Sequence, residues 1–171
     1  MIQSMCGGMS YQYLNPETRQ KEARRVFFPQ PHAQVPVLSD GGEVLLYQWG
    51  KRNKEEDPEY EVPVTGWART DKLESGYWKH YHPQEVLIPA LRFSEKGKLP
   101  KSKWFDMPKD TYLMGLKIEK RDKNFIYIVT NPAIGELEKI HPRMPLVVKA
   151  DFSPADFDIE EAAEPEQQKL F

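Results

Sequence analysis

Frequent prolines and short apolar runs decide what this chain can fold into. Fifteen prolines put bends throughout its 171 residues, since each one fixes φ and removes a backbone donor. The runs between them are rich in β-branched and aromatic residues, which is typical of strands. We predict strands at EVLLYQW (43–49), EVLIPAL (85–91), TYLMGLKIE (111–119), NFIYIVT (124–130) and MPLVV (144–148), with 111–119 and 124–130 joined as a hairpin.

Short helices are predicted between these strands. Asn15, Pro16 and Glu17 supply an N-cap residue, a first-turn proline and an acid at the positive end of the helix dipole. We therefore expect a helix at 17–25, and helical segments at 71–81, at 132–140 and from 153 onward. Without a long βαβ rhythm, this pattern indicates an α+β fold, namely a β-rich single domain with antiparallel, barrel-like sheets and short flanking helices. The polar stretch RNKEEDPEYE (52–61) predicts a solvated loop.

Charge is distributed unevenly along the chain. Residues 151–171 hold seven acids against one lysine, whereas residues 1–150 carry 23 Lys and Arg against 19 Asp and Glu. The body is thus mildly basic, which permits contacts with phosphate groups. No apolar run approaches the ~20 residues of a membrane span, and no signal peptide is recognisable. We expect a monomeric cytoplasmic protein, associated with the nucleoid if bacterial, without a membrane partner.

The single cysteine lies in the stretch MCGG, residues 5–8. One cysteine excludes an internal disulfide and a cysteine-rich zinc site, so Cys6 is either an inert small residue or a reactive thiol. If the mature chain began at Cys6, that residue would carry a free amine and a thiol together. If Met1 to Met5 stay attached, the nitrogen of Cys6 is an amide. If translation begins at Met5, that methionine precedes a small residue and can be trimmed.

Seven segments carry a resemblance when they are read in order. They are MCGG, YQWG, WART, LIPALRFSEK, YLMGL, YIVTNPA and IHPRMPLVV. Each is weak alone, but in this order and spacing they resemble the SOS response-associated peptidase (SRAP) domain family over residues 5–148. The resemblance implies a compact β-rich domain with a positively charged groove. It also implies a sensor of abasic sites in single-stranded DNA that crosslinks itself to the lesion through an N-terminal cysteine.

Site residues follow from the resemblance, position by position. It implies that Cys6 is the nucleophile and that Glu95 and His141 are the acid and base groups beside it. For DNA binding it implies Arg69 and the neighbourhood of Trp49, and we add Trp67 as an aromatic that can stack on bases and Arg143 as a charge that can anchor a phosphate. Judged without the resemblance, Glu95 resembles a solvated turn residue, His141 a structural histidine like His32, His80 or His82, and Trp49 and Trp67 core aromatics. His80 and His82 lack a third ligand, so we expect no metal and no cofactor.

The chemistry of an abasic site fits an N-terminal cysteine. The ring-opened sugar offers an aldehyde, and an α-amine with a pKa near ~8 is partly neutral at pH 7 and can form an imine. The sulfur of the same residue can then close a five-membered thiazolidine, an intramolecular step with a large effective molarity. A carboxylate and an imidazole facing one pocket would manage the protons.

Two departures from the family pattern bear on this hypothesis. Residues 1–4 form an extension before Met5, and if Met1 to Met5 stay attached Cys6 can form only a reversible thiohemiacetal. We favour a start at Met5, because Met5-Cys6-Gly7 resembles an intact family beginning. The family usually has asparagine where this chain has Trp67. An indole has one donor and more bulk than an amide, so lesion preference can differ.

The acidic end forms a third segment after the SRAP-like domain at 5–150. Residues 151–171 are predicted to be largely flexible. Their end, QQKLF, resembles the pentapeptide that binds bacterial sliding clamps, with Gln167, Leu170 and Phe171 as the contact residues. The alternative is an apolar end that docks on its own domain.

Three functions are compatible with these residues. The first is covalent capture of abasic sites, with an associated crosslinking or lyase activity. The second is a cysteine-dependent peptidase or self-processing thiol hydrolase, in which His141 activates Cys6 and Glu95 orients it. The third is a noncovalent single-stranded DNA-binding module.

Overall fold

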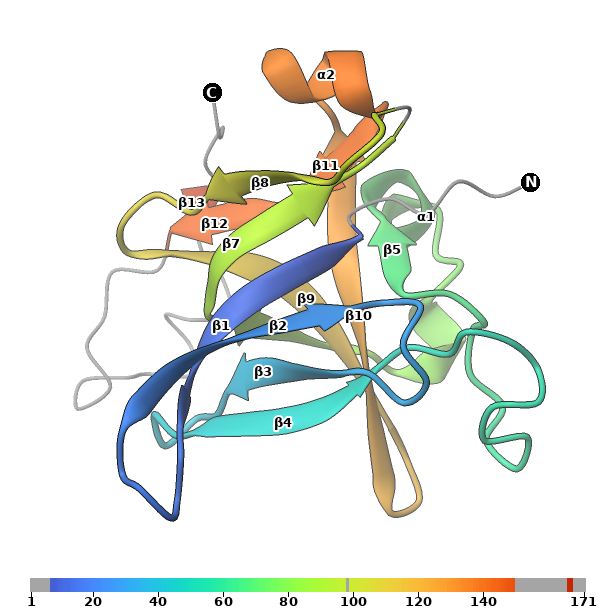
Figure 1. Ribbon diagram of the computed structural model, residues 1–171. Helices are drawn as coiled ribbons and strands as arrows, with labels where there is room; N and C mark the ends of the chain where they lie inside the picture. Colours follow the sequence, from blue (N-terminus) through green and yellow to red (C-terminus); the bar gives the residue numbers. More distant parts are fainter. Residues whose placement is uncertain (1–6, 98, 150–165, 168–171) are drawn as a thin grey trace.

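A computed structural model describes residues 7–97, 99–149 and 166–167 (Figure 1). Strands dominate it, and two short α-helices and one 3-10 helix (η1) accompany them. The strands are β1 (Gly8–Leu14), β2 (Lys21–Phe27), β3 (Gln34–Leu38), β4 (Val44–Trp49), β5 (Trp67–Arg69), β6 (Gln84–Ile88), β7 (Ala90–Glu95), β8 (Lys103–Asp106), β9 (Thr111–Lys120), β10 (Lys123–Pro132), β11 (Arg143–Pro145), β12 (Val147–Lys149) and β13 (Glu166–Gln167).

Five strands close into a barrel. β3 pairs antiparallel with β4 and with β6, β6 with β9, and β9 with β10. A parallel pairing of β4 with β10 completes the ring. The β-rich fold with antiparallel, barrel-like sheets and short helices is therefore confirmed.

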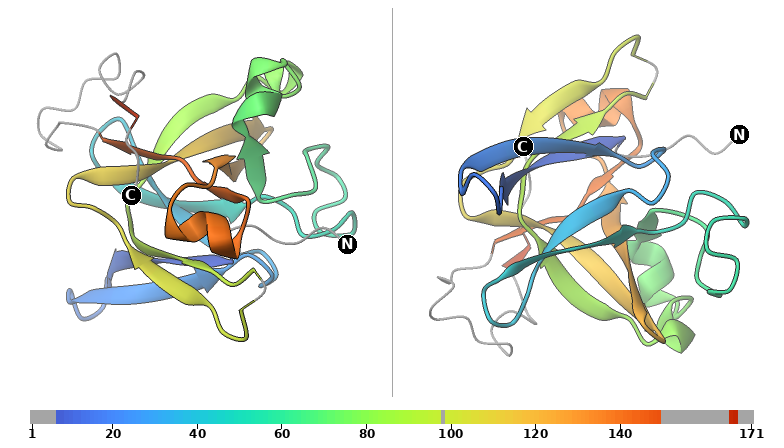
Figure 2. Two further views of the ribbon diagram at one scale, coloured as in Figure 1. Left: turned by 90° about the horizontal axis from the view of Figure 1, so that it is seen from above. Right: turned by 60° about the horizontal axis from the view of Figure 1, so that its bottom comes forward.

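A smaller antiparallel sheet, in the order β2-β1-β7-β8, packs against the barrel (Figures 1 and 2). Its inward residues share one core with β3 and β10 of the barrel, and they include Met9, Val26, Phe93 and Phe105. A second core covers the other face of β10. Because β10 places Ile126 and Ile128 in the first core and alternate residues in the second, it is buried on both faces and ties the two layers together.

The predicted helix at 17–25 is wrong. The Asn15 side chain does accept N–H bonds from Glu17 and Thr18, at 2.9 and 3.3 Å, as an N-cap would. Arg19 then adopts a left-handed φ of 56°, and the chain returns as β2 beside β1. The capping signal thus belongs to a hairpin turn.

The other predicted helices are shorter than expected. α1 covers Thr70–Glu74 and η1 Lys79–Tyr81, with a turn at Gly76 (φ 86°) between them. α2 covers Glu136–Ile140, since the residues up to Pro132 belong to β10. The helix expected from residue 153 lies outside the described residues.

The predicted strands are present, but two of them are divided. Strand β4 corresponds to the run predicted at 43–49, β9 to the run at 111–119 and β10 to the run at 124–130. The run at 144–148 is divided between β11 and β12. The run 85–91 divides at Pro89, so that β6 joins the barrel and β7 joins the small sheet. In the acidic segment, β13 pairs with β12. Among the described residues, no helix is long and apolar enough to cross a membrane.

Candidate functional site

The start of β1 is fixed against the end of β7. Gly7, the first described residue, donates its N–H to the Ser94 carbonyl at 2.9 Å and accepts an N–H bond from Phe28 at 3.1 Å. Gly8 pairs with Ser94 on one side and with Phe27 on the other. Cys6 lies outside the described part of the chain, but a peptide bond joins it to Gly7. The covalent attachment point of the predicted nucleophile is therefore fixed next to Ser94.

Glu95 follows Ser94 as the last residue of β7. It pairs with Lys103 of β8, and its side chain has no exposed surface. The interpretation of Glu95 as a solvated turn residue is therefore wrong. An ionisable side chain that is completely buried needs polar surroundings or a chemical role to offset its desolvation.

Helix α2 lies near the end of β7 and the start of β8 (Figure 1). Gly97, just past β7, has φ +51°, and a Cβ built on it would lie 2.1 Å from the Ile140 carbonyl oxygen. Lys103 of β8 forms an ion pair with Glu136 of α2 at 3.3 Å. These contacts bring His141, the residue after α2, to the strand end that carries Glu95. Only glycine suits position 97, because the left-handed φ and the close backbone both exclude a side chain.

His141 is buried, with 4% of its surface exposed. Its N–H bonds to the Leu137 carbonyl at 2.8 Å, and its Nδ1 accepts the backbone N–H of Arg143 at 3.0 Å. A backbone N–H can only donate, so Nδ1 carries no proton and Nε2 carries the single proton of the neutral ring. Burial lowers the pKa of His141, and the positive charge of Arg143 adds to this effect. The imidazole is thus held neutral with an Nε2–H donor.

Arg143 is a buried cation in β11. Its side chain is 8% exposed, and its Nη2 donates to the carbonyl and hydroxyl oxygens of Thr130 and approaches the hydroxyl of Thr70. Burial lowers the pKa of Arg143, and the charge of Arg69 lowers it further. Its Nε has no hydrogen-bond partner among the described residues. A buried guanidinium with a free donor is suited to a phosphate or carboxylate oxygen.

Arg69 lies beside Arg143 at the end of β5. In the pairing of β5 with β10, Arg69 lies opposite Thr130, which is also the residue that accepts hydrogen bonds from Arg143. The guanidinium is half-exposed and makes a double contact with Asp71, at 3.0 Å from both Nε and Nη2. The hydrogen bond to Asp71 raises the pKa of Arg69. Arg69 therefore presents a fixed positive charge at the rim.

The two tryptophans predicted to meet DNA belong to the core. Trp49 is fully buried, and its Nε1 donates to the Gly66 carbonyl at 2.9 Å. Trp67 is 8% exposed and packs on Phe28 and Trp49 at centroid distances of 4.6 and 6.0 Å. Neither ring offers an open face on which a base could stack. The Nε1–H of Trp67 is buried and donates to no acceptor among the described residues, so it remains free to donate a hydrogen bond.

The structure therefore gathers part of the predicted site. The chain that leads to Cys6, together with Glu95, His141 and Arg143, lies around the meeting point of β1, β7, α2 and β11, with Arg69 at the edge. Sequence reasoning missed Ser94, Gly97 and Thr130, which position these groups. Ser94 and Gly97 directly flank Glu95 and Lys96 in the run SEKG, but their role depends on pairing with distant strands. Gln167 lies in β13, and Leu170 and Phe171 fall beyond the described residues.

A surface pocket of about 550 Å³ lies elsewhere. It is formed at the opposite end of β7, around Pro89, Leu91, Met107 and Tyr112. None of the predicted site residues lines it. Its place gives it no part in chemistry at Glu95.

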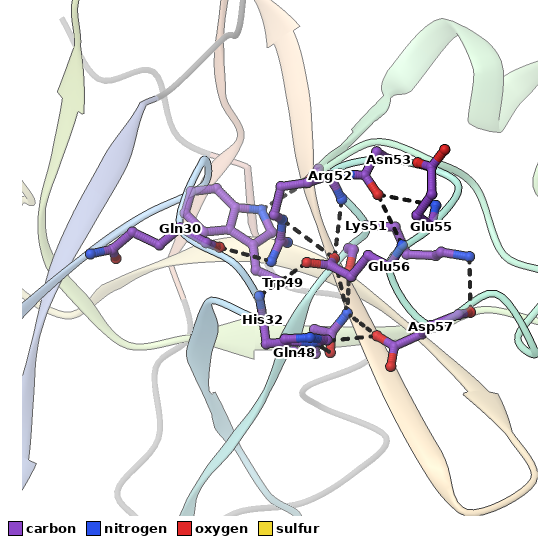
Figure 3. A network of polar contacts seen from close by, with 12 residues as sticks. Gln30, His32, Gln48, Trp49, Lys51, Arg52, Asn53, Glu55, Glu56 and Asp57 are labelled. Carbon is purple, nitrogen blue, oxygen red and sulfur yellow. Dashed lines mark hydrogen bonds and ion pairs between the residues drawn. The ribbon is translucent and has the colours of Figure 1, made fainter.

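A second polar cluster occupies the segment predicted to be a solvated loop (Figure 3). Glu56 is buried there and accepts N–H bonds from His32, Arg52 and Gln48 at 3.0, 3.1 and 3.3 Å. Burial raises the pKa of Asp57, but hydrogen bonds from Gln48 and Lys123 outweigh it and hold that pKa below its usual value. The prediction of a solvated loop is thus wrong at Glu56.

This cluster is not a convincing metal site. His32, Glu56 and Asp57 offer atoms within 4.8 Å of one another. The carboxylate oxygens already accept protein donors, and the Lys123 ammonium lies 3.0 Å from Asp57. A cation would have to displace these contacts, so we assign the cluster a structural role.

Comparisons with known proteins add no identification. No family model matches this sequence, and no curated protein is significantly similar to it. The resemblance to the SRAP family therefore stays a hypothesis.

Proposed function

We propose that this protein captures abasic sites in single-stranded DNA as a covalent adduct of Cys6. One observation carries the proposal. The residue next to Cys6 is hydrogen-bonded to Ser94, on the strand end that carries the buried Glu95 and that contacts the end of α2, where His141 follows. The proposal requires the amine and thiol of Cys6 to reach Glu95 and His141.

The reaction needs only the lesion and the protein. The α-amine of Cys6 adds to the aldehyde carbon of the opened sugar and gives a carbinolamine, which loses water to form an imine. The sulfur then adds to the imine carbon, and the thiol proton passes to the nitrogen. The product is a thiazolidine, and one water is released per adduct. Ring closure is favoured because both nucleophiles belong to one residue.

Glu95 and His141 have different roles in this proposal. In neutral His141, Nδ1 accepts the backbone N–H of Arg143. The Nε2–H is therefore the ring group that remains to donate a hydrogen bond to a substrate. A neutral imidazole that donates a hydrogen bond polarises an oxygen, as at the carbinolamine hydroxyl, without transferring its own proton. Proton transfer then falls to Glu95, which can take a proton from the attacking amine and return it to the departing water.

Arg143 and Arg69 supply the anion contacts. Contacts of Nη2 with Thr130 and Thr70 fix the position of the Arg143 side chain, and its Nε has no partner among the described residues. A phosphate oxygen would accept the hydrogen bond that Nε can donate. Arg69 adds charge at the rim. A phosphate next to the lesion would thereby be fixed relative to Glu95.

The decisive experiment compares two starting points of the chain. Protein whose first residue is Cys6, verified by intact mass, should form a heat-stable shifted band with abasic single-stranded DNA on a denaturing gel. Protein that retains Met1 to Met5 should form none. Cys6→Ser in the free-amine form should give only an imine, visible after borohydride reduction. Absence of any adduct with a verified N-terminal Cys6 contradicts the proposal, and hydrolysis of a model peptide by that protein would favour the thiol hydrolase.

Trp67 offers a test of the pocket. Trp67→Phe keeps most of the ring and removes the buried indole N–H, so the protein should fold with a free energy within about 1 kcal/mol of the original. If that donor contacts the lesion, adduct formation slows while stability holds. Trp49→Phe is the matched control, because its N–H is already bonded to Gly66 and its loss should cost stability without a selective loss of rate.

A further inference from the structure

The outer face of the small sheet carries an arrangement that the proposed reaction does not use. Inward residues of β1, β2, β7 and β8, such as Met9, Val26 and Phe93, are buried in the core. The alternate residues point outward because side chains alternate along a strand. Two cross-strand rows of these outward residues lie next to each other.

The first row is aromatic at its ends and small in its middle. It runs Phe27, Gly8, Ser94, Trp104 across the four strands. Phe27 lies directly over Gly8, since a Cβ there would approach its ring to 2.7 Å. Phe27 meets Trp104 edge to face at a centroid distance of 5.9 Å. The two rings therefore bridge the middle strands, and Trp104 is only partly buried.

The second row carries positive charge. It runs Arg25, Ser10, Arg92, Asp106. The guanidinium carbons of Arg25 and Arg92 lie 4.7 and 5.5 Å from the Trp104 ring centre. Arg92 forms an ion pair with Asp106 at 3.1 Å, whereas exposed Arg25 has no carboxylate within 4.0 Å among the described residues. Among the described residues, the charge of Arg25 is therefore not neutralised by an ion pair.

This outer face is continuous with the candidate site. Ser94 of the first row accepts the Gly7 N–H and precedes Glu95 in β7. A strand held at the site could therefore pass directly onto Trp104 and Arg25. Aromatic rings combined with arginines along a groove or sheet are the usual means of holding single strands without sequence preference.

We propose that the outer face of this sheet, formed by Arg25, Arg92, Phe27 and Trp104, binds the single-stranded DNA that flanks the lesion. A base stacks against Trp104, and Arg25 and Arg92 contact phosphates. This inference rests on the proposed function for its substrate, yet it concerns undamaged nucleotides. It predicts binding that needs neither Cys6 nor an abasic site. The alternative is that the arginines only cover Trp104 in the folded protein.

Neighbouring arginines on β2 provide a matched pair of variants. Arg25 and Arg24 are both exposed, but Arg24 lies over Tyr13 on the other side of the strand, 3.4 Å from that ring centre. Arg25→Glu and Arg24→Glu change the net charge equally. Any difference between them in DNA affinity therefore reports local contact and not the overall field.

The DNA affinity of each variant is measured by fluorescence anisotropy with an undamaged, labelled oligothymidylate. An oligonucleotide of about 12 nucleotides matches the length that single-strand sites of this kind cover. Arg25→Glu should weaken binding by tenfold or more and reduce the salt slope by about 0.7 per lost phosphate contact. Arg24→Glu should change the affinity by less than about threefold, as expected for a charge without contact. Equal losses in the two variants would overturn the inference.

Trp104 gives a second readout, because Trp49, Trp67 and Trp78 are 0%, 8% and 3% exposed. Oligothymidylate should quench tryptophan fluorescence in the original protein and not in Trp104→Phe, provided that both show the same thermal unfolding. Unchanged quenching in Trp104→Phe would overturn stacking on this ring.

The adduct assay separates this inference from the proposed function. At limiting abasic DNA, Arg25→Glu should lower the adduct yield in step with its weaker binding, whereas Arg24→Glu should keep the yield of the original protein. If the original protein forms no adducts but binds undamaged DNA in a way that depends on Arg25, the proposed chemistry is contradicted and the inference about the outer face is supported. If adducts form normally but the affinity for undamaged DNA does not change in the Arg25 and Trp104 variants, only the inference about the outer face is contradicted.

Discussion

Two buried polar clusters in this molecule differ in how completely the protein satisfies them. Around Glu56, both carboxylate oxygens accept N–H bonds, and Gln48 links that side chain to Asp57 and Gly50 (Figure 3). Two residues from His141, Arg143 keeps a buried Nε without a hydrogen-bond partner among the described residues, and the same holds for Ser94 Oγ on β7 and Trp67 Nε1 on β5. We call the first cluster closed because the Glu56 carboxylate is satisfied at both oxygens, although Arg52 Nε and Nη2 have no hydrogen-bond partner among the described residues. We call the second set of groups open.

The difference shows what each cluster contributes. Buried polar groups usually find partners, and those that do not lower stability by roughly 1–3 kcal/mol each. The closed cluster holds residues 51–57 against β4 and so stabilises the fold. The open cluster lowers stability, and its free donors at Arg143 and Trp67 are available to an incoming molecule. Function is therefore expected at the open cluster.

Breaking the closed cluster should give the largest effect on stability. Glu56→Ala leaves the N–H groups of His32 and Arg52 and the amide of Gln48 without their acceptor, and it removes the charge opposite the Arg52 guanidinium. We expect a loss of about 3 kcal/mol in the free energy of unfolding, as for a broken buried pair. Urea denaturation followed by circular dichroism measures it.

The neighbour Glu55 is the control for this change. It is exposed, so Glu55→Ala should alter the free energy of unfolding by less than about 0.5 kcal/mol. Adduct formation per folded molecule should be unaffected in both variants. A smaller loss for Glu56→Ala than for Glu55→Ala would contradict the closed network.

The open cluster should respond to pH through His141. Burial keeps the folded-state pKa of His141 below its usual value, so below about pH 6.5 the unfolded chain binds a proton that the folded chain refuses. Stability contributed by the neutral ring is therefore present above that pH and is lost as pH falls, with a slope of at most about 1.4 kcal/mol per pH unit for one proton.

His141→Asn isolates this titration. The asparagine oxygen can accept the Arg143 N–H in place of Nδ1 but cannot be protonated, so the fall in stability between about pH 6.5 and pH 5 should become shallower. His80→Asn, at an exposed position, is the control for the same replacement away from the site. Denaturation midpoints across this range measure both. An unchanged slope in His141→Asn would show that the imidazole titrates normally in the fold.

The sequence predicts four of the five barrel strands but not β3, and of the small sheet it predicts only the start of β7, within the run 85–91. The runs in β4, β9 and β10 carry enough β-branched and aromatic residues to be recognised locally. By contrast, β2 reads KEARRVF and has five exposed residues in succession. It is a strand because β1 pairs with it, and the N-cap signal at Asn15 pointed instead to a helix. Pairing between distant segments cannot be read from local composition.

The candidate site divides in the same way. Glu95 and His141 were predicted through the order and spacing of short motifs, yet the polar run SEKGK gave no sign that Glu95 is buried. Its burial comes from α2, which reaches it through the contact of Gly97 with Ile140. Trp49 shows the opposite error, since an aromatic that could stack on bases is a core residue here.

The smallest effect is expected at Ser94, and it tests whether the second cluster is open at all. The Ser94 hydroxyl is fully buried without a partner among the described residues. Ser94→Ala removes an unsatisfied polar group and leaves a methyl group, so the free energy of unfolding should stay the same or rise by up to about 1 kcal/mol. If the hydroxyl serves Cys6 or the lesion, adduct formation slows although the protein is no less stable. Ser10→Ala, at the adjacent outward position of β1, controls for loss of a hydroxyl in this sheet. A loss of more than about 1 kcal/mol in Ser94→Ala alone would mean that the fold itself satisfies the hydroxyl, and the contrast between the two clusters would then rest on Arg143 and Trp67.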